Sequence, residues 1–424
     1  MAKGKKKERE KYASSSHEDS GIELIFSNHP SFQDKSVDKI SKEQCIAQLW
    51  AGYGTIHSFV ISFDDGTTLP LVIKRVNPPQ DDSSISHQRK LKSYTIEANF
   101  YNQIAPQLEN RQCIVPIPYS IRNKDSPANS FQFILSDLST NYSSSYSSLD
   151  RKDTLSALSW LAKFHSAFYQ HPIITSCGTC SSDNDIHDDD EGSNVQIVWS
   201  SGGYWHLKTR LDELESVDAS KGNKFSCFHP NNSQLAFMID DRMNESSNTS
   251  FTLVHGDYKK DNILFSNDGR NNSSECAVVD FQYCGAGYGM KDVVMLIVSS
   301  VSRSTLHEMG EESLLTFYHQ EFIKFREQKS DNDGNSSIAD DGVLNLGAMR
   351  KQYELSLLDY VRFMSGWGFW GSNVDYAEEK TWSLLKEIVS EGKEIKLVKA
   401  EDIYNMSDED WKNAIYKRYP LSEF

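Results

Sequence analysis

The residues best suited to chemistry lie in the segment HGDYKKDN, residues 255–262, between the apolar runs TLV and ILF. Asp257 and Asn262 are five positions apart, and Asp280 follows eighteen positions later in VVDFQ. Phosphoryl transfer uses one carboxylate to accept or orient the proton of an attacking hydroxyl. It also uses an amide and a second carboxylate to hold Mg²⁺ on the phosphates. This spacing therefore indicates phosphoryl transfer, whereas a polar surface hairpin is the plainer alternative.

The elements that must position these residues are short strands. TLV, ILF and AVVDF are apolar runs typical of strands, with a turn at 267–269. Because a hairpin returns on the neighbouring strand, it places Asp280 beside Asn262. Asp257 then stays in the loop, where a substrate can reach it.

Two upstream residues complete the set. Lys74 ends the predicted strand LPLVIK, where its ammonium could reach the α- and β-phosphates, and Glu97 on the following helix could hold it by an ion pair. A Lys at a strand end is usually solvated, and a helical Glu usually faces water. The order of these residues along the chain, followed by the downstream acids and amide, favours kinase-type chemistry.

The first part of the chain reads as a small sheet with one main helix. Residues 49–76 predict three strands, with Asp65-Gly66 as a hairpin turn. A helical stripe covers 93–106, and two more strand patterns lie in 113–121 and 131–138. We therefore expect a five-stranded antiparallel lobe.

The second part is richer in helix. A core helix is expected at 154–170. Further helices are expected at about 292–302, 311–328, 346–366 and 376–392, and polar loops at about 175–195, 240–250 and 329–341. The fold class is α+β, a bilobal protein-kinase-like fold with the site between the lobes. We expect a disordered tail at 1–36, with ordered structure from about Ser41, a nucleotide-binding lobe at 37–138 and a mostly helical catalytic and substrate-binding lobe at 139–424.

Composition limits the partners. The 424 residues carry a formal charge of −16, which argues against nucleic acid or an anionic membrane as the main partner. No run approaches the length of a membrane span, and the basic N-terminus has no apolar stretch behind it. Seven scattered cysteines are typical of free thiols. We expect a cytoplasmic protein; a nuclear signal in the basic tail is the alternative.

HGDYKKDN followed by VVDFQ resembles the Brenner-type motif His-Gly-Asp-x-x-x-x-Asn with its downstream metal Asp. That motif marks the superfamily of aminoglycoside phosphotransferases and choline kinases. YTIEANFY, FILSDL, WLAKFHSAF, GGYW and YELSLLDYVRFMSGWGFWG are similar to stretches of its ecdysteroid-kinase-like branch. The resemblance covers about residues 45–390.

Carried to this sequence, the resemblance implies that Asp257 is the catalytic base and that Asn262 and Asp280 are Mg²⁺ ligands. Lys74 becomes the phosphate-binding lysine, with Glu97 as its partner.

The resemblance also implies a nucleotide hinge at FILSDL, where backbone groups from Leu135 to Asp137 face adenine. His255 is expected to brace the loop by hydrogen bonds rather than take part in chemistry. Members of the superfamily phosphorylate hydroxyl groups of small molecules with ATP.

Some positions depart from the strongest kinase pattern. Gly52 and Gly54 flank a bulky Tyr53, so this segment is either a phosphate-covering loop or only a turn. Lys259 either meets the transferring phosphate or is a solvated neighbour of Lys260. No Arg precedes the catalytic Asp, and no Ala-Pro-Glu follows the metal Asp, which speaks against a peptide substrate.

Two clusters of possible metal ligands are explained more simply without a metal. Cys177 and Cys180, with His171 and His187, are zinc-type ligands, but the spacing matches no standard finger and free thiols are favoured. The run at 188–191 is a solvated acidic stretch rather than a calcium loop.

A group of aromatic residues could line a cleft for an apolar or cationic acceptor, although ordinary core packing is favoured. Its members are Tyr204, Trp205, Tyr360, Trp367 and Trp370, with Arg362 nearby. Asp359 could bind a substrate or pair with an Arg.

Together these features predict a small-molecule kinase that uses ATP and Mg²⁺ to phosphorylate a choline-, steroid- or aminoglycoside-like hydroxyl. The alternatives are a silent nucleotide-binding relative and, less favoured, a protein kinase. No obligatory protein partner is evident in the sequence.

Overall fold

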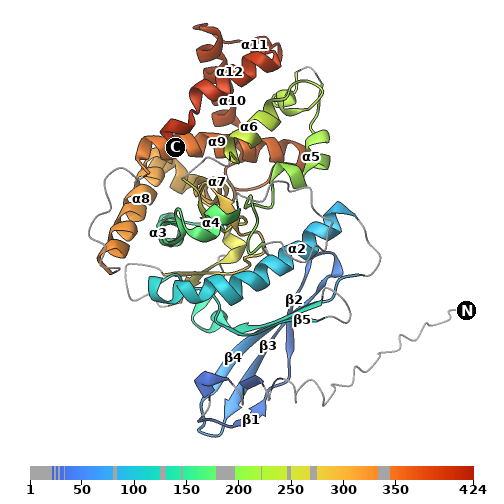
Figure 1. The fold of residues 1–424 in the computed structure, drawn as a ribbon, viewed down its shortest axis with the longest axis vertical. Coiled ribbons are helices and arrows are strands. Elements are labelled where there is room, and N and C mark those ends of the chain that lie inside the picture. Colours follow the sequence, from blue (N-terminus) through green and yellow to red (C-terminus); the bar gives the residue numbers. More distant parts are fainter. Residues whose placement is uncertain are drawn as a thin grey trace, which may run out of the picture. The chain divides into compact units, whose positions relative to one another are not determined.

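The chain folds into two compact units, each described here by itself. The computed structural model describes residues 22, 25–26, 29–32, 34–79, 84–124, 130–144, 147–177, 196–220, 222–245, 250–267, 275–332 and 344–424. The first unit comprises Met1–Pro79 and Ile117–Asp137, and the second comprises Gln80–Pro116 and Leu138–Phe424 (Figure 1). The helix expected in the first lobe thus belongs by its contacts to the second unit. The lobe boundaries expected at 138/139 stay a prediction.

The first unit is built on an antiparallel sheet of six strands in the order β1-β3-β4-β6-β5, with β2 also paired to β3. The strands are β1 (Val37–Ile40), β2 (Gln44–Gln48), β3 (Gly54–Phe63), β4 (Thr68–Val76), β5 (Pro118–Lys124) and β6 (Ser130–Ser136). We expected five strands, three of them within 49–76. Instead that range holds two strands and a short turn, while β1 and β2 precede it. VDKI and QCIAQ were missed because they are short, largely exposed strands with no strong apolar alternation.

The β3–β4 hairpin confirms the turn expected at Asp65-Gly66. Gly66 has a φ of 80°, and the Phe63 amide donates to the carbonyl of Thr67. The Asp65 side chain accepts from the Thr67 amide at 2.9 Å, which is the local bond that makes Asp a good turn residue.

The core of the first unit lies on one face of the sheet. It contains Phe59, Ile61 and Leu71, and two residues from far upstream, Ile22 and Phe26, are 4% and 0% exposed within it. The segment expected to be a tail therefore includes core residues. An apolar cluster as short as the one around Phe26 shows no periodicity, so the sequence pattern could not place it.

The second unit is mainly helical. Its helices are α2 (Ile85–Asn99), α3 (Arg151–Phe168), α4 (Pro172–Cys177), α5 (Leu211–Glu215), α6 (Leu235–Met243), α7 (Met290–Ser299), α8 (Arg303–Asn332), α9 (Leu346–Trp367), α10 (Val374–Lys393), α11 (Ala400–Tyr404) and α12 (Asp408–Arg418). The expected long helices are present. Helix α8 starts earlier than expected and is kinked at Gly310, whose φ is 74°. Helices α4, α6 and α8 also extend into the three segments expected to be loops.

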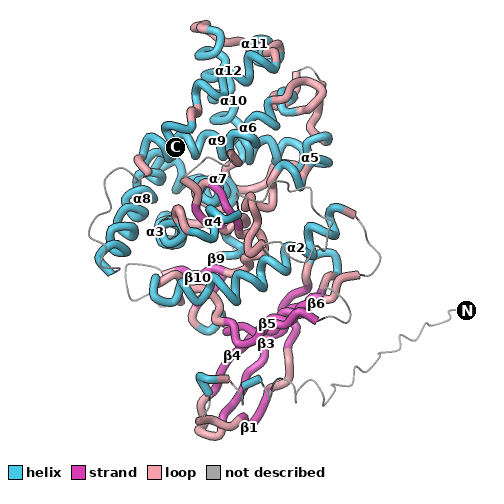
Figure 2. The backbone as a smooth tube through the Cα atoms, viewed as in Figure 1, coloured by secondary structure: helices cyan, strands magenta, loops and turns pink. Residues whose placement is uncertain are grey.

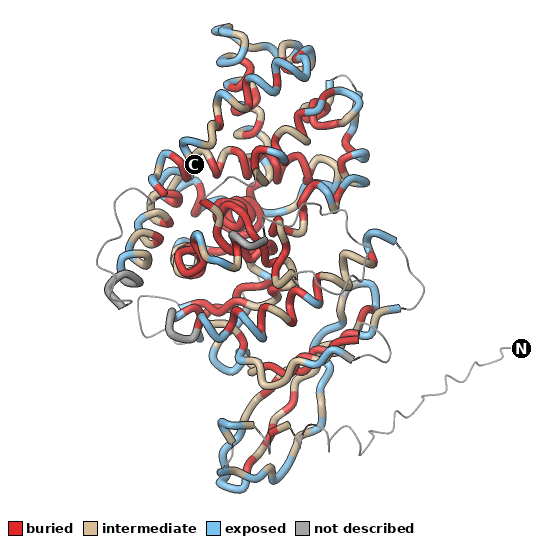
Figure 3. Tube along the Cα trace, in the orientation of Figure 1, coloured by how far each residue is buried: buried red, intermediate tan, exposed pale blue. Residues whose placement is uncertain are grey.

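Helix α7 is the centre of this unit. All ten of its residues are buried, including a Lys and an Asp, and Figure 3 shows the helix almost wholly in the buried colour. Helix α7 packs against α9, and α3 packs along α8. None of the helices in the described ranges has both the length and the apolar character of a membrane span.

Two small sheets complete the second unit (Figure 2). One has the order β10-β9-β7 and the other pairs β11 with β8. The strands are β7 (Tyr142–Ser144), β8 (Thr252–Val254), β9 (Ile263–Ser266), β10 (Cys276–Val278) and β11 (Gly285–Gly287). The loops β8–β9 and β10–β11 therefore both connect one small sheet to the other, and these loops carry Asp257, Asn262 and Asp280.

Candidate active site

The loop between β8 and β9, residues 255–262, is called the catalytic loop below. Ile263 pairs with Val278 across the β9–β10 hairpin, and the Val279 amide donates to the carbonyl of Asn262 at 3.0 Å. The expected hairpin is confirmed. It brings the chain just before Asp280 next to Asn262, as the spacing of the motif requires.

Asp257 and Asn262 are in direct contact. The Asn262 side-chain amide donates to the Asp257 backbone carbonyl at 2.8 Å and to its carboxylate at 3.1 Å. The Lys259 ammonium lies 2.9 Å from both carboxylate oxygens of Asp257. Lys259 is thus held on the catalytic-loop acid rather than only facing water.

The carboxyl of Asp257 is buried, which raises its pKa to about 6 because the charged form loses its hydration. The Lys259 ammonium works against this shift, and the negative charge of Asp280 adds to it. The charge of Asp280 therefore acts on the Asp257 carboxyl, which also contacts the Asn262 amide.

Asp280 has a left-handed backbone with a φ of 69°. Such a conformation costs about 1–3 kcal/mol for a residue other than glycine and is concentrated at functional sites. Burial raises the pKa of the Tyr101 hydroxyl, and the charges of Glu97 and Asp280 raise it further. Both acids therefore lie near Tyr101.

His255 braces the catalytic loop as the sequence analysis expected. Its Nδ1 accepts from the Asp257 amide at 3.2 Å, and its Nε2 lies 3.1 Å from the carbonyl of Val279. Burial lowers the pKa of His255, which favours the neutral imidazole that can accept at Nδ1 while donating at Nε2. His255 thus ties the loop of Asp257 to the loop of Asp280.

A second brace was missed by sequence reasoning. Asp292 of α7 is fully buried and accepts from the amides of His255 and Gly256 at 2.6 and 2.9 Å. The ring of His165 on α3 lies 3.1 Å from the same carboxylate. Burial by itself would raise the pKa of Asp292, but these donors hold it below its ordinary value. An Asp directly before the apolar run VVMLIV was the available signal.

Phe281, which follows Asp280, anchors its loop in an aromatic cluster. Its ring stacks on Phe100 at the end of α2, with centroids 3.7 Å apart. His255 lies 4.8 Å from the same ring, and Trp160 of α3 lies 6.4 Å from it. The helix that carries Glu97 is therefore packed directly on the loop that carries Asp280.

Gly256 is needed for a close backbone approach. Its φ is 82°, and a Cβ there would lie 2.2 Å from the carbonyl oxygen of Tyr283 and 2.8 Å from the amide nitrogen of Gly203. The Tyr204 amide, in the GGYW segment, donates to the carbonyl of Gly256 at 3.1 Å. The glycine in the motif is thus explained by packing as well as by backbone freedom.

The remaining nucleotide candidates belong to the first unit. Lys74 lies on β4 opposite Ile56 and Phe133; it is 7% exposed, with its ammonium 5.7 Å from the Phe133 ring centroid. Lys74 belongs to the first unit and Glu97 to the second, and their ion pair stays a prediction.

Gly52 and Gly54 lie in a tight turn between β2 and β3, closed by a bond from the Leu49 amide to the Gly54 carbonyl at 2.9 Å. A Cβ on Gly54 would lie 1.9 Å from the carbonyl oxygen of Arg75, so this glycine is required by strand packing. A phosphate-binding role for the two glycines stays a prediction.

Leu135 lies on β6, and the amide of Asp137 donates to the carbonyl of Pro70 at 3.1 Å. The chain passes from the first unit to the second immediately after Asp137. This segment therefore connects the units, as a hinge would, while its contact with adenine stays a prediction.

The donor set suits Mg²⁺ rather than a softer metal. Asn262 and Asp280 offer oxygen ligands, and Mg²⁺ typically takes one or two protein carboxylates and fills the other positions with water and phosphate oxygens. Within the described ranges, no group of three or more His, Cys, Asp or Glu could hold a metal by itself. The zinc candidates Cys180 and His187, the side chain of Cys177 and the acidic run at 188–191 lie outside the residues whose side chains are described.

The aromatic group divides into two. Trp205, Tyr360 and Arg362 are completely buried, so ordinary core packing accounts for them. Tyr204 is only partly buried and lies near both Asp257 and the Lys259 ammonium, which is 5.9 Å from its ring. Trp367 is 48% exposed. Tyr204 and Trp367 therefore remain candidates for an acceptor wall.

Asp359 pairs with an Arg, which was one of its two expected roles. Its carboxylate accepts from Nε and Nη2 of Arg362 at 2.9 and 2.7 Å, and Arg362 also donates to the carbonyl of Trp205. Asp240 is the next acid of this cluster. Its pKa is raised to about 7, first by burial and then by the charge of Asp359, while the charge of Arg362 opposes the rise.

Replacing Asp359 by Ala should lower the free energy of unfolding by about 3 kcal/mol, because it leaves the buried guanidinium without its main partner. Because the charge of Asp240 still acts on Arg362, we expect the loss of free energy of unfolding to be near the lower end of the range of about 3–5 kcal/mol for a broken buried ion pair. Urea unfolding measures the effect, and Asp241→Ala on the exposed side of α6 is the control. A loss below about 1 kcal/mol would show that the ion pair contributes little.

The comparisons with known proteins agree with the motif. The model of the ecdysteroid kinase-like family matches residues 61–329. The chain belongs to the ecdysteroid kinase-like family. The resemblance drawn from HGDYKKDN and VVDFQ is thus confirmed, and so is the α+β, kinase-like fold class. No curated protein matches the sequence.

Solved structures with a similar arrangement include a choline kinase from Cryptosporidium parvum Iowa II. It is 12% identical, with 88% of this chain and 97% of that chain covered and a TM-score of 0.41. A GDP complex of wild-type aminoglycoside 2'-phosphotransferase-IIIa is also 12% identical, with 94% and 99% covered and a TM-score of 0.38. The amicoumacin kinase hAmiN, bound to AMP-PNP, Ca²⁺ and Ami, is 9% identical, with 88% and 92% covered and a TM-score of 0.38. At these scores the likeness says nothing about the activity of this chain.

Proposed function

We propose that this member of the ecdysteroid kinase-like family is an ATP-dependent small-molecule kinase that phosphorylates a hydroxyl group. The supporting observation is that Asp257 and Asn262 contact each other on the catalytic loop, and that His255 ties this loop to the one that carries Asp280. Asp292 holds the catalytic loop from α7. Family membership supports the same reaction class.

In the proposed reaction, the acceptor hydroxyl hydrogen-bonds to the Asp257 carboxylate and its oxygen attacks the γ-phosphorus in line. A bond forms between the hydroxyl oxygen and phosphorus while the bond to the β,γ-bridging oxygen breaks, so ADP leaves. The hydroxyl proton passes to Asp257 and then to solvent. Placement of the two reactants supplies much of the rate, since little covalent chemistry is asked of the protein.

In the proposed reaction, cations neutralise the negative charge of the phosphates. Mg²⁺ held by Asn262 and Asp280 would neutralise negative charge on the phosphate oxygens. Lys74 is proposed to bind the α- and β-phosphates, and Glu97 to orient it. The Lys259 ammonium, which contacts Asp257, is proposed to contact the transferring phosphoryl group as well.

Nucleotide binding is tested without turnover. We expect ATP with Mg²⁺ to raise the midpoint of thermal unfolding more than ATP with EDTA, because the proposed Mg²⁺ site strengthens nucleotide binding. A ligand at about 100 times its Kd adds about 2.7 kcal/mol to the free energy of unfolding. Asn262→Ala should remove the Mg²⁺-dependent part, and Asn231→Ala, at an exposed position, should keep it. Absence of any ATP-dependent shift would contradict the proposal.

Replacing Lys259 by Met should lower kcat about 10- to 10³-fold, because a cation is lost from the point where charge develops in the transition state. ATP affinity should change far less. Lys260→Met is a matched control, because the side chain of Lys260 pairs with the exposed Asp261 instead. Steady-state kinetics of both variants decide the point: equal behaviour would mean that the contact between Lys259 and Asp257 is only structural.

A further inference from the structure

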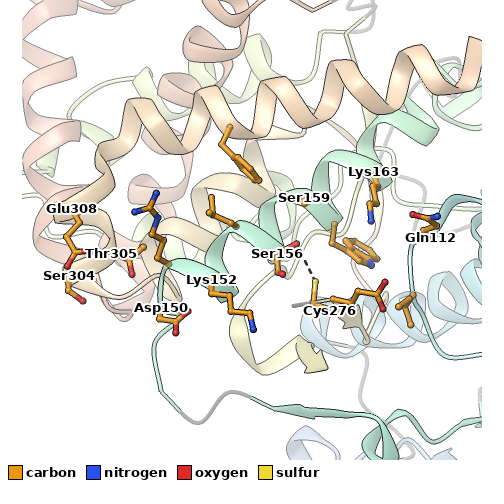
Figure 4. A pocket seen from close by; sticks show the side chains of 16 residues that line it. Gln112, Asp150, Lys152, Ser156, Ser159, Lys163, Cys276, Ser304, Thr305 and Glu308 are labelled. Atoms are coloured by element: carbon orange, nitrogen blue, oxygen red, sulfur yellow. Dashed lines mark hydrogen bonds between the residues drawn. The ribbon is translucent and has the colours of Figure 1, made fainter. Parts of the chain in front are cut away.

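A cavity of about 810 Å³ lies in the second unit, away from the catalytic-loop residues just described. Its walls come from α3 as far as Lys163, the first half of α8, the start of β10 and the chain at 112–114 (Figure 4). Neither Asp257, Asn262 nor Asp280 lines it. Its volume is within the range of small-molecule sites.

One part of the wall is apolar. Leu155, Trp160 and Phe317 supply this surface, and Trp160 is 3% exposed. A ligand with an aromatic ring would pack against these side chains.

Three cations (Arg151, Lys152 and Lys163) and three carboxylates (Asp150, Glu275 and Glu308) line the cavity, so the position of each cation decides where a ligand anion would lie. Lys152 and Lys163 both line the cavity, and neither forms an ion pair with any described residue; the Lys163 ammonium lies over the Phe325 ring at 5.3 Å. The carboxylate of Glu308 is at the opposite end from Lys163 in Figure 4. Glu275 is a further carboxylate in the lining. A ligand carboxylate is therefore expected close to Lys163 rather than beside Glu308.

The wall of the cavity is also the support of the catalytic loop. The Trp160 ring stacks on Tyr258, the residue after Asp257, with centroids 5.8 Å apart. The Tyr258 hydroxyl donates to the carbonyl of Ala157 on α3 at 2.9 Å. Trp160 also reaches Phe281, the residue after Asp280. A ligand that moves Trp160 must therefore disturb the packing of both loops.

We infer that this cavity is a second binding site, for a ring-bearing carboxylate of metabolite size, whose occupation is coupled to nucleotide binding through Trp160 and Tyr258. The binding half of this inference is independent of the proposed kinase activity. The coupling between the two sites rests on ATP binding at the proposed active site. Because such coupling is reciprocal, a ligand in the cavity should change ATP affinity by the same factor by which ATP changes the affinity for that ligand.

The probe is 1-naphthoate, with 1-naphthylmethylamine as the oppositely charged match, and binding is followed by calorimetry and ligand-observed NMR. Leu155→Trp fills the cavity, whereas Leu397→Trp makes the same change at a 78% exposed position. Lys163→Met removes the cation with little effect on packing, so it serves if Leu155→Trp fails to fold. We expect naphthoate to bind wild type and Leu397→Trp, and to bind Leu155→Trp and Lys163→Met at least tenfold more weakly.

Equal binding to all four proteins, tighter binding of the amine, or no binding of naphthoate would overturn the assignment of the site. A fivefold or larger change in ATP affinity with saturating naphthoate, lost in Leu155→Trp, supports the coupling, and an unchanged affinity overturns it. Failure of wild type to bind ATP would contradict the kinase proposal, while naphthoate binding would still be measured separately.

Discussion

Asp257→Asn should lower kcat by about 10²–10⁴-fold, the usual contribution of a positioned general base. Asn is nearly isosteric and cannot take the hydroxyl proton at neutral pH, so the chemical step is affected while the loop geometry is kept. The Asn262 amide and the Lys259 ammonium can still contact the remaining side-chain oxygen, as they contact the carboxylate now. We therefore expect ATP affinity to stay close to that of wild type.

Asp261→Asn is the matched control, because it makes the same substitution in the same loop at a side chain that is 60% exposed and pairs only with Lys260 among the described residues. Rapid-quench measurement of phosphoryl transfer, with ATP binding followed by calorimetry, separates the two effects. If Asp257→Asn kept turnover like that of Asp261→Asn, Asp257 would not be the base.

Asp292→Ala should lower the free energy of unfolding by about 5 kcal/mol, the largest stability effect we expect in this unit. Its carboxylate is the acceptor for two backbone amides of the catalytic loop and a partner of the His165 ring. Each buried donor left without an acceptor costs about 1–3 kcal/mol, and the two amides and the His165 ring lose their partner together.

Asp292→Asn should lose less, because its carbonyl oxygen still accepts one of the two loop amides. Asp375→Ala, at a side chain that is 76% exposed, should change the free energy of unfolding by less than about 0.5 kcal/mol. Urea unfolding at neutral pH orders the three variants. A small loss in Asp292→Ala would mean that the loop amides find other acceptors and that the brace is not essential.

The parts of the site that the sequence predicts are those set by local spacing. Asp257 and Asn262 share one loop, and a hairpin must return Asp280 to the side of Asn262, so three residue types and two intervals were sufficient to place them. The hairpin at Asp65-Gly66 and the long helices follow in the same way, because turn chemistry and apolar periodicity act within a few residues.

The parts that the sequence did not predict depend on contacts between distant residues. Asp292 reaches the catalytic loop from a helix more than thirty positions later, and its type alone does not say which amides it meets. The stacking of Phe281 on Phe100 joins two segments that sequence patterns treat separately. Ile22 and Phe26 were assigned to a tail because a few apolar residues show no period, yet they complete the core under the sheet.

The most direct test of phosphoryl transfer by the Asp257 site follows the label from γ-labelled ATP into a fractionated metabolite extract, with Mg²⁺ present. We predict a labelled, phosphatase-sensitive ester of a small hydroxyl compound with wild-type protein, and none with Asp257→Asn. Label found on protein instead, or an equal amount of ester from the Asp257→Asn variant, would contradict the assignment.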